Sequence, residues 1–289
     1  MHVWRDYQSL LYILLLPGLV IWQWHAGFSW PAYLLVLFLT VGTGVVHHNH
    51  SHKRIWRYRW LNRLTDIWMT LLQGHPTFVF YPTHNANHHR YRHGERDIAR
   101  TYRFTTPGAR GDSNHLLGYL LHPLQAIMVL YPHIFFWLKN RFHRQRGVFW
   151  YCMAQYGAVL LLWTALAAID ANKFLLLVLV PQLHGLHWLL ATNYLQHAHA
   201  DGRARGFNFA RNFEGLLNPL LFNIGLHTAH HQHPCAHWSE LPALHRRYRA
   251  QIDPRLNEKS LVCYMFRVYL LGALHRRWRT YSLMAPLKD

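Results

Sequence analysis

The chain has 289 residues, of which 51% are hydrophobic and 15% aromatic, and its formal net charge is +18. Such basicity indicates nucleic acid, a membrane surface or an acidic protein as a partner. The basic residues lie beside apolar runs and no nucleic-acid-binding motif is visible, so the composition favours a membrane protein and argues against a nucleic-acid binder. The three cysteines, Cys152, Cys235 and Cys263, form no CxxC motif, which argues against a disulfide framework or a zinc ribbon.

The first apolar segment, residues 8–28, is long enough to cross a bilayer, which needs about 20 residues. A signal peptide is the alternative reading. The apolar region is long, no small-residue cleavage site follows, and a second apolar segment over 32–46 begins at once, so we expect a retained span. Basic residues follow the second segment and assign its end to the cytoplasm by the positive-inside rule. They are Lys53, Arg54, Arg57, Arg59 and Arg63.

The middle of the chain mixes apolar and polar segments. Residues 60–82 are apolar but contain Asp66 and Pro76, so we expect them to lie in the membrane interface or to re-enter. Residues 116–138 are interrupted by His122-Pro123 and Pro132-His133, which predicts an interfacial segment or a shallow hairpin.

The two clearest spans cover residues 148–169 and 174–195. The expected fold is therefore all-α: an integral membrane helical bundle of about four transmembrane spans with interfacial helices, forming a single domain over residues 1–289. The last apolar stretch, Leu261 to Leu274, is too short and too interrupted by Arg267 to span readily.

Four polar clusters lie mostly at the ends of these apolar segments. Because residues i, i+3 and i+4 share one face of a helix, each cluster can direct its imidazoles at one point. The clusters are His48/His52, His84/His88/His89, Asn193/His197 and His227/His230/His231. Nine imidazoles are too many for one tetrahedral zinc ion and suit two metal ions, with iron a leading candidate. The competing view is chance proximity in a chain with 26 histidines, which four clusters of helical spacing disfavour. With four spans, every cluster ends on the same side of the membrane.

Other polar residues near these clusters are expected to have supporting roles. His184 and His187 fall inside the fourth span and are expected to be structural, hydrogen-bonded residues. His47, His50, His93, His199, His233 and His237 are expected to make hydrogen bonds or to lie at the surface. Glu95, Asp97, Asp201 and Glu240 are candidate partners for the N–H groups of metal-binding histidines.

The order HxxxH, HxxxHH, NxxxH, HxxHH over about residues 40–245 resembles the membrane fatty acid desaturase and hydroxylase superfamily, which includes the alkane hydroxylases. The stretch 222–231, FNIGLHTAHH, with Trp238-Ser239 and Leu241-Pro242 after it, is very similar to the third histidine box of desaturases. The HxxxHH spacing differs from the HxxHH of many desaturases and is also used by alkane hydroxylases.

The resemblance implies two iron ions, with O2 as co-substrate, acting on unactivated C–H bonds of long acyl or alkyl chains. The metal-binding residues that it implies are His48, His52, His84, His88, His89, His197, His227, His230 and His231. Asn193 matches a position that, in some members, approaches a metal directly or through water.

We therefore expect an O2-dependent di-iron fatty acyl desaturase. A hydroxylase or an oxidative decarboxylase on the same scaffold is the alternative enzyme. A histidine-rich metal transporter is the alternative from another class, and it would place its ligands inside the spans. The expected partners are a fatty acyl substrate, membrane lipid, no nucleic acid, and a separate electron donor such as ferredoxin, rubredoxin or cytochrome b5.

The expected location is a multi-pass membrane protein whose active site faces the cytoplasm, of the kind found in a bacterial inner membrane. A basic segment follows the second cluster and contains Arg90, Arg92, Arg96, Arg100 and Arg103. Its charges are expected to establish topology and to contact anionic lipid. They are also candidates for steering an acidic electron donor.

Overall fold

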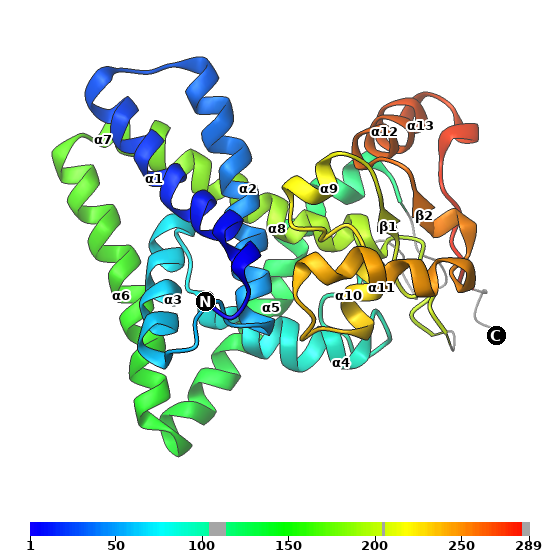
Figure 1. The fold of residues 1–289 in the computed structure, drawn as a ribbon, viewed down its shortest axis with the longest axis horizontal. Coiled ribbons are helices and arrows are strands. Elements are labelled where there is room, and N and C mark those ends of the chain that lie inside the picture. Colours follow the sequence, from blue (N-terminus) through cyan, green and yellow to red (C-terminus); the bar gives the residue numbers. More distant parts are fainter. Residues whose placement is uncertain (104–113, 204–205, 285–289) are drawn as a thin grey trace. The chain divides into compact units, whose positions relative to one another are not determined.

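The computed structural model describes residues 1–103, 114–203 and 206–284 (Figure 1). Those residues are mostly helical, as expected, and their only strands form one short parallel pair. The chain divides into two compact units. Unit 1 comprises Met1–Pro82 and Ile134–Leu189, and unit 2 comprises Thr83–His133 and Leu190–Asp289. Two of the three boundaries fall inside long helices, α5 (Leu116–Arg144) and α8 (Val180–His197), and the third falls inside the π-helical segment Tyr81–His88.

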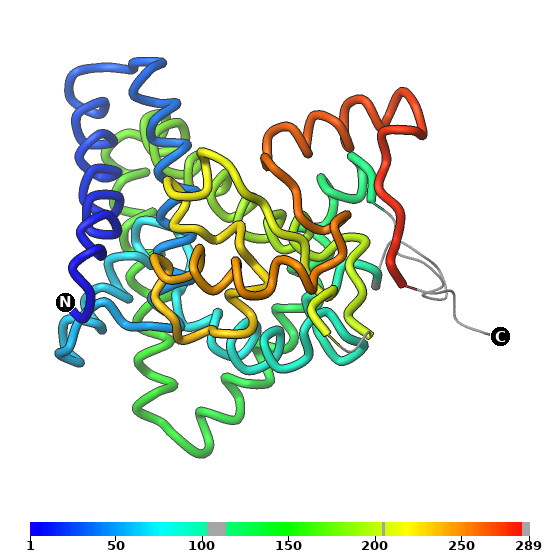
Figure 2. The backbone as a smooth tube through the Cα atoms, turned by 45° about the vertical axis from the view of Figure 1, so that its right-hand side comes forward, coloured from blue at the N-terminus to red at the C-terminus, as the bar shows by residue number. Residues whose placement is uncertain are grey.

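Unit 1 is built on a pair of apolar helices, α1 (Tyr7–Ala26) and α2 (Trp30–His52), which lie side by side (Figures 1 and 2). The turn between them uses Gly27, whose φ of 101° is readily adopted only by glycine. The helices can approach closely because Gly42 faces the ring of Tyr12, where a Cβ atom would overlap the ring. The remaining helices of the unit are α3 (Arg59–Gln73), α6 (Arg146–Ile169), α7 (Ala171–Lys173) and a π-helical turn, Phe174–Leu179.

The helix α3 directs its polar face into unit 1. Thr70 and, beyond the helix, Thr77 donate to the Oε1 atom of Gln155 on α6, at 3.3 and 3.2 Å. The opposite face exposes large apolar side chains, among them Trp60 and Leu64. A helix with a buried polar face and an exposed apolar face is suited to lipid contact, and the interfacial position of residues 60–82 stays a prediction.

The segment after residue 115 differs from the prediction. It is one continuous helix, α5, which contains both Pro123 and Pro132, so the expectation of a shallow hairpin is wrong. A proline removes one backbone hydrogen bond and can kink a helix without ending it. Within the part of the chain that the structure describes, five helical stretches, rather than four, are long and apolar enough to cross a membrane: Trp4–Ala26, Trp30–His52, Leu116–Arg144, Arg146–Ile169 and Ala171–His197. With four spans, all clusters were expected on the same side of the membrane. With five candidate spans, the number of crossings no longer supports that expectation.

Unit 2 carries most of the histidine clusters on short elements. They include the π-helical segment Tyr81–His88, α4 (His89–Tyr91), α9 (Leu217–Leu220), α10 (His227–Gln232), α11 (Leu241–Tyr248), α12 (Leu261–Met265) and α13 (Gly272–Leu274). The strand β1 (Asn212–Phe213) pairs in parallel with β2 (Asn257–Glu258). The buried guanidinium of Arg211 pairs with Glu258 at 3.1 Å beside this contact. Asn212 also bonds both the backbone N–H and the hydroxyl of Thr228, which anchors α10.

Candidate metal centre

The second histidine cluster lies on a π-helical segment and not on the α-helix that the sequence predicted. Residues Tyr81–His88 have π-helical geometry, followed directly by α4. The i→i+5 bonds of a π-helix widen each turn, so that positions i+4 and i+5 both lie near position i. The spacing of His84, His88 and His89 matches that wider turn. This local backbone brings all three imidazoles to one side, with ring centroids of His84 5.1 Å from His88 and 4.6 Å from His89.

Four buried histidines of unit 2 direct their Nε2 atoms at a common point. His197 Nε2 lies 3.2 Å from His88 Nε2 and 3.1 Å from His227 Nε2, and His231 Nε2 lies 3.1 Å from His227 Nε2. Two donors on one metal ion at about 2.0–2.1 Å stand roughly 3.0–3.4 Å apart. The spacing of these nitrogen atoms therefore fits a shared metal ion, and the four residues form one group that could hold such an ion.

The tautomers of two of these histidines show why a cation fits there. His88 Nδ1 lies 2.7 Å from the carboxylate Oδ2 of Asp97, and His197 Nδ1 lies 2.8 Å from the carbonyl oxygen of Phe209. Both oxygens can only accept, so each Nδ1 carries a hydrogen. When both rings are neutral, as metal ligands are, the Nε2 atoms of His88 and His197 face each other as lone pairs. Such an arrangement is unfavourable in a buried site unless a positive ion lies between the donors.

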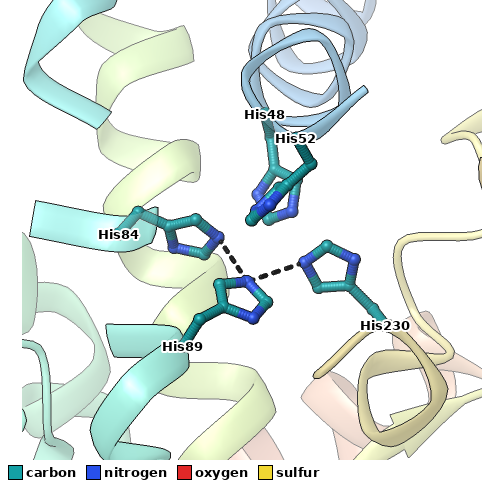
Figure 3. A group of neighbouring side chains, drawn as sticks. All are labelled: His48, His52, His84, His89 and His230. Atoms are coloured by element: carbon teal, nitrogen blue, oxygen red, sulfur yellow. Dashed lines mark hydrogen bonds between the residues drawn. The ribbon is translucent and has the colours of Figure 1, made fainter. Parts of the chain in front are cut away.

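A second set of donors in unit 2 consists of His84, His89 and His230. Their nitrogen atoms point toward one another in Figure 3. His89 Nε2 lies 3.0 Å from both His84 Nε2 and His230 Nε2. The ring of His89 stacks on that of His231 with centroids 4.3 Å apart, so the two sets of donors are adjacent. The residues of unit 2 thus fit two neighbouring metal ions.

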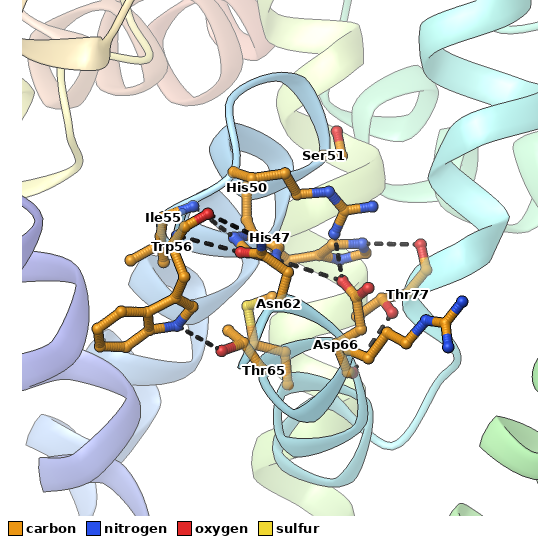
Figure 4. Close-up of polar contacts among 12 residues, drawn as sticks. His47, His50, Ser51, Ile55, Trp56, Asn62, Thr65, Asp66 and Thr77 are labelled. Carbon is orange, nitrogen blue, oxygen red and sulfur yellow. Dashed lines mark hydrogen bonds and ion pairs between the residues drawn. The ribbon is translucent and has the colours of Figure 1, made fainter. Parts of the chain in front are cut away.

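His48 and His52 belong to unit 1. They project from the last turn of α2, with ring centroids 5.2 Å apart, and Figure 3 also draws them. The adjacent part of α2 is held by hydrogen bonds (Figure 4). His47 contacts Gln73 Oε1 and the carbonyl of Thr77, and His50 accepts from the backbone N–H of Ile55. These contacts fix the direction of the helix end that carries His48 and His52. Their role as ligands stays a prediction.

Asn193 lies on the part of α8 that belongs to unit 2. Its amide nitrogen donates to the carbonyl of Ala99 at 2.6 Å. That hydrogen bond commits one end of the side chain to the loop that contains Asp97. Direct or water-mediated metal contact by Asn193 stays a prediction.

Asp97 is the carboxylate that supports the centre. It is fully buried and accepts from His88 and from the backbone N–H groups of His93 and Ala99. Burial would by itself raise its pKa, but the neighbouring His88 and these hydrogen bonds lower the pKa of Asp97 to about 2. Of the four candidate carboxylates, Asp97 is thus shown to bind the N–H group of a clustered histidine. Burial, followed by the proximity of His89 and His227, lowers the pKa of His231 well below its usual value, which keeps this donor neutral.

Histidines outside the clusters make other contacts. His184 lies 3.3 Å from the hydroxyl of Thr40, in agreement with a structural role. The partners of three others are the hydroxyl groups of Thr280, Tyr248 and Ser239, bound by His199, His233 and His237, respectively. The ring of His93 is fully buried and stacks on that of His197.

Two supports of the centre were missed by sequence reasoning. The carbonyl of Phe209 sets the tautomer of His197, and Asn212 anchors the start of α10. A backbone carbonyl has no signature in the sequence. Asn212 could have been singled out only as a polar residue in a segment of fully buried residues.

Comparison with known families agrees with this site. The chain matches a family model described as fatty acid desaturase over residues 22–259, which includes every clustered histidine. A search of curated proteins found no match. Because the matched region covers most of the sequence, and the site within it fits two metal ions, the chain belongs to the fatty acid desaturase family of the membrane desaturase and hydroxylase superfamily.

Proposed function

We propose that this protein is an O2-dependent di-iron oxidoreductase that introduces a double bond into a long acyl chain. The observation that carries the proposal is the convergence of buried Nε2 lone pairs from His88 and His197, whose other ring nitrogens are committed to Asp97 and Phe209. The family supplies the reaction class, since its members are desaturases and related hydroxylases.

In this proposal, one iron ion is held by His88, His197, His227 and His231. The other is held by His84, His89 and His230. The family resemblance adds His48 and His52 to the proposed ligands. When bound, the iron pair supplies the oxidising power that saturated C–H bonds require, since no acid or base can remove those hydrogens. For a double bond to form, O2 takes two hydrogens from the chain and two electrons and two protons from the donor side, and it leaves as two water molecules.

The protein's own residues keep the donors neutral and oriented. Asp97 holds the proton on His88 Nδ1, the carbonyl of Phe209 does the same for His197, and both leave Nε2 free for a metal. Imidazole ligands leave the metal pair more positively charged than carboxylates would. We propose that Asn193 positions a water molecule beside one of the ions.

Desaturation is favoured over hydroxylation by the sequence around the third cluster, FNIGLHTAHH over 222–231, which is very similar to that of desaturases. The HxxxHH spacing, shared with alkane hydroxylases, is the observation that supports hydroxylation or oxidative decarboxylation as the second candidate. Mass spectrometry of lipids from cells with and without the protein separates them. A desaturase product lacks two hydrogens, a hydroxylase product gains an oxygen atom, and a decarboxylase product loses its carboxyl carbon.

The metal assignment is tested by measuring iron in the purified protein. His88→Ala and His230→Ala are each expected to lower the iron content and to abolish product formation while leaving membrane insertion intact. His25→Ala, an exposed residue in the last turn of α1, is the control and should change neither. Full iron content and turnover in both variants would refute the assignment. Metal flux into vesicles without O2 consumption would support the transporter instead.

The role of Asn193 is tested by two variants compared side by side. If the amide positions a water molecule, Asn193→Ala should keep most of the iron and lose much of the rate. His197→Ala should lose iron. An equal loss of iron in both variants would show that Asn193 is itself a ligand.

A further inference from the structure

The helix near the end of the described chain presents an entirely apolar face to its surroundings. It runs from Leu261 to Leu274 as α12, a π-helical turn and α13, and it lies beyond the residues matched by the family model. Its exposed positions recur with helical periodicity: Val262, Cys263, Phe266, Leu270, Ala273 and Leu274. Val262, Phe266 and Leu270 are more than half exposed and Leu274 is 84% exposed. A stripe of this kind on a folded protein marks a surface that is covered by another apolar phase.

The opposite face attaches this helix to the rest of unit 2. Tyr264 and Tyr269 are buried, and their hydroxyl groups bond the side chain of Asn114 at 2.7 and 3.0 Å. The ring of Tyr269 also stacks on that of Tyr119, at a centroid distance of 4.9 Å. Tyr119 lies in the first turn of α5, one of the five helices suited to cross a membrane. The helix is thus docked at the end of a candidate span, which is where a bilayer meets water.

The end of α5 that carries Tyr119 has its own exposed apolar residues. Leu117, Leu120 and Leu124 are 60, 47 and 62% exposed, although they are large and apolar. A helix and the candidate span that it contacts therefore both leave apolar side chains uncovered by the protein. Lipid can cover both at once, whereas a protein partner of the helix alone would leave the residues of α5 exposed.

Charge around the helix identifies the kind of lipid surface. Residues 259–284 contain no acidic residue and five basic ones: Lys259, Arg267, which pairs with Glu258 at 2.8 Å, Arg276, Arg277 and Arg279. Arg276 and Arg277 are exposed directly after the helix, and the guanidinium of Arg277 lies 4.9 Å from the ring centre of Trp278. Arginine and tryptophan beside an apolar helix face suit the headgroup region of an anionic bilayer.

We propose that residues 261–279 form an interfacial anchor, which lies along the surface of an anionic phospholipid bilayer with its exposed apolar face among the lipid chains. At about 1.5 Å per residue the helix is roughly 21 Å long, too short for a hydrocarbon core of about 30 Å. It therefore lies along the membrane and does not cross it. The anchor holds unit 2, which carries the candidate metal centre, against the membrane that would supply an acyl chain. Only the benefit to catalysis rests on the proposed function; membrane contact does not.

The native cysteines allow a direct test in the full chain. Cys152 is buried, while Cys263, on the apolar face, and Cys235, outside the helix, are exposed. In a Cys235→Ser variant, an environment-sensitive fluorophore is attached to Cys263. In a Cys263→Ser variant the same fluorophore is attached to Cys235 as the matched control. Both proteins are placed in nanodiscs of phosphatidylcholine and phosphatidylglycerol.

The fluorophore at Cys263 is expected to emit at shorter wavelength, to be quenched by brominated lipids and to be shielded severalfold from aqueous iodide relative to the one at Cys235. Lipids brominated near the headgroup should quench it more than those brominated near the chain end. Equal access of iodide to both fluorophores would overturn the proposal. So would shielding without lipid quenching, which would indicate a second copy of the chain or another protein on this face.

The arginines are tested separately by the double substitution Arg276→Gln/Arg277→Gln. It should reduce lipid quenching at Cys263 in discs that contain phosphatidylglycerol and have less effect in phosphatidylcholine alone. Arg246→Gln/Arg247→Gln, an adjacent exposed pair on α11, is the matched control and should have no effect. If neither phosphatidylglycerol nor the substitution of Arg276 and Arg277 changes the quenching, the proposed preference for anionic lipid is wrong. Iron content and turnover, measured in the same samples, report on the proposed function independently.

Discussion

A single buried carboxylate prepares the metal centre. Asp97 accepts from the ring of His88 and from two backbone N–H groups that follow the second cluster. It therefore fixes both the tautomer of a ligand and the course of the loop around it. A charged group of this kind can stay buried because every interaction made by its two oxygen atoms is with a donor.

The substitution Asp97→Asn tests this role with little change in shape. Asparagine can present its amide nitrogen to His88 Nδ1, and the ring hydrogen then moves to Nε2, where it opposes metal binding. We expect iron affinity to fall by about 10–100-fold, measured by competition with a chelator. Glu95→Gln, an exposed residue of the same loop, is the control. Unchanged iron affinity in Asp97→Asn would show that the carboxylate is only structural.

A second residue-scale prediction concerns pH. Burial lowers the pKa of His75, which lies just after α3, to about 4 from a usual value of 6.5. Below pH 6.5 the unfolded chain gains a proton that the folded chain does not accept, so this residue makes stability fall as the pH falls from 6.5 toward 4. The slope from one such group approaches about 1.4 kcal/mol per pH unit. His75→Asn should flatten the dependence of the unfolding temperature on pH in this window.

The matched control for His75 is His2→Asn, because His2 is exposed. Its substitution should leave the pH dependence unchanged. The same pH dependence in the wild-type and His75→Asn proteins would show that His75 is protonated in the folded state as readily as in the unfolded chain.

At the scale of elements, the approach of α1 and α2 depends on Gly42. A methyl group at this position would overlap the ring of Tyr12, whereas one at Gly18 in α1 would meet no atom within 4 Å. Gly42→Ala is therefore expected to destabilise unit 1 by about 1–3 kcal/mol. Gly18→Ala should be neutral or stabilising by up to about 1 kcal/mol. Thermal unfolding in detergent measures both, and the added substitution Tyr12→Leu should partly restore Gly42→Ala. Equal unfolding temperatures for the two alanine variants would contradict this account of the helix contact.

Another consequence at this scale concerns how each cluster divides its ligands. The π-helical segment contributes His88, which points toward His197, and His84, which meets His89 at the start of α4. On α10, His227 and His231 join one set of donors and His230 the other. Each of these short helices thus contributes to both sets, so local distortion of either helix should affect both metal ions together.

At the scale of the whole molecule, the basic surface after the second cluster yields a prediction about electron delivery. Arg90, Arg92 and Arg96 are exposed, whereas Arg100 is half-buried with its guanidinium 5.0 Å from the ring centre of Tyr102. We propose that the exposed arginines steer an acidic electron donor. Turnover limited by donor should then fall as salt shortens the Debye length from about 10 Å at 0.1 M to about 3 Å at 1 M.

The paired change Arg90→Gln/Arg96→Gln should flatten this salt dependence without altering membrane insertion. Arg246→Gln/Arg247→Gln serves again as the control. If neither salt nor the substitution of Arg90 and Arg96 changes donor-limited turnover, these arginines do not steer the donor. Their role is then limited to topology and lipid contact.

The sequence by itself determined the helical class, the membrane character and the set of clustered histidines. Those properties depend on local patterns. The length of an apolar run and the spacing of residues along a helical turn are visible in the sequence without knowledge of which helices pack together. The assignment of Asp97 as a candidate partner was also within reach, since acidic residues are few in this chain.

Only the tertiary structure decided which histidines of unit 2 meet, and that α5 continues through Pro123 and Pro132. The grouping of ligands depends on segments that are far apart in the sequence. The helix α5 has 29 residues, so its other backbone hydrogen bonds far outnumber the two that the prolines remove. The contact of the Phe209 carbonyl with His197 Nδ1 was likewise found only in the tertiary structure. A backbone atom acquires a function only from its position in space, which no side-chain pattern encodes.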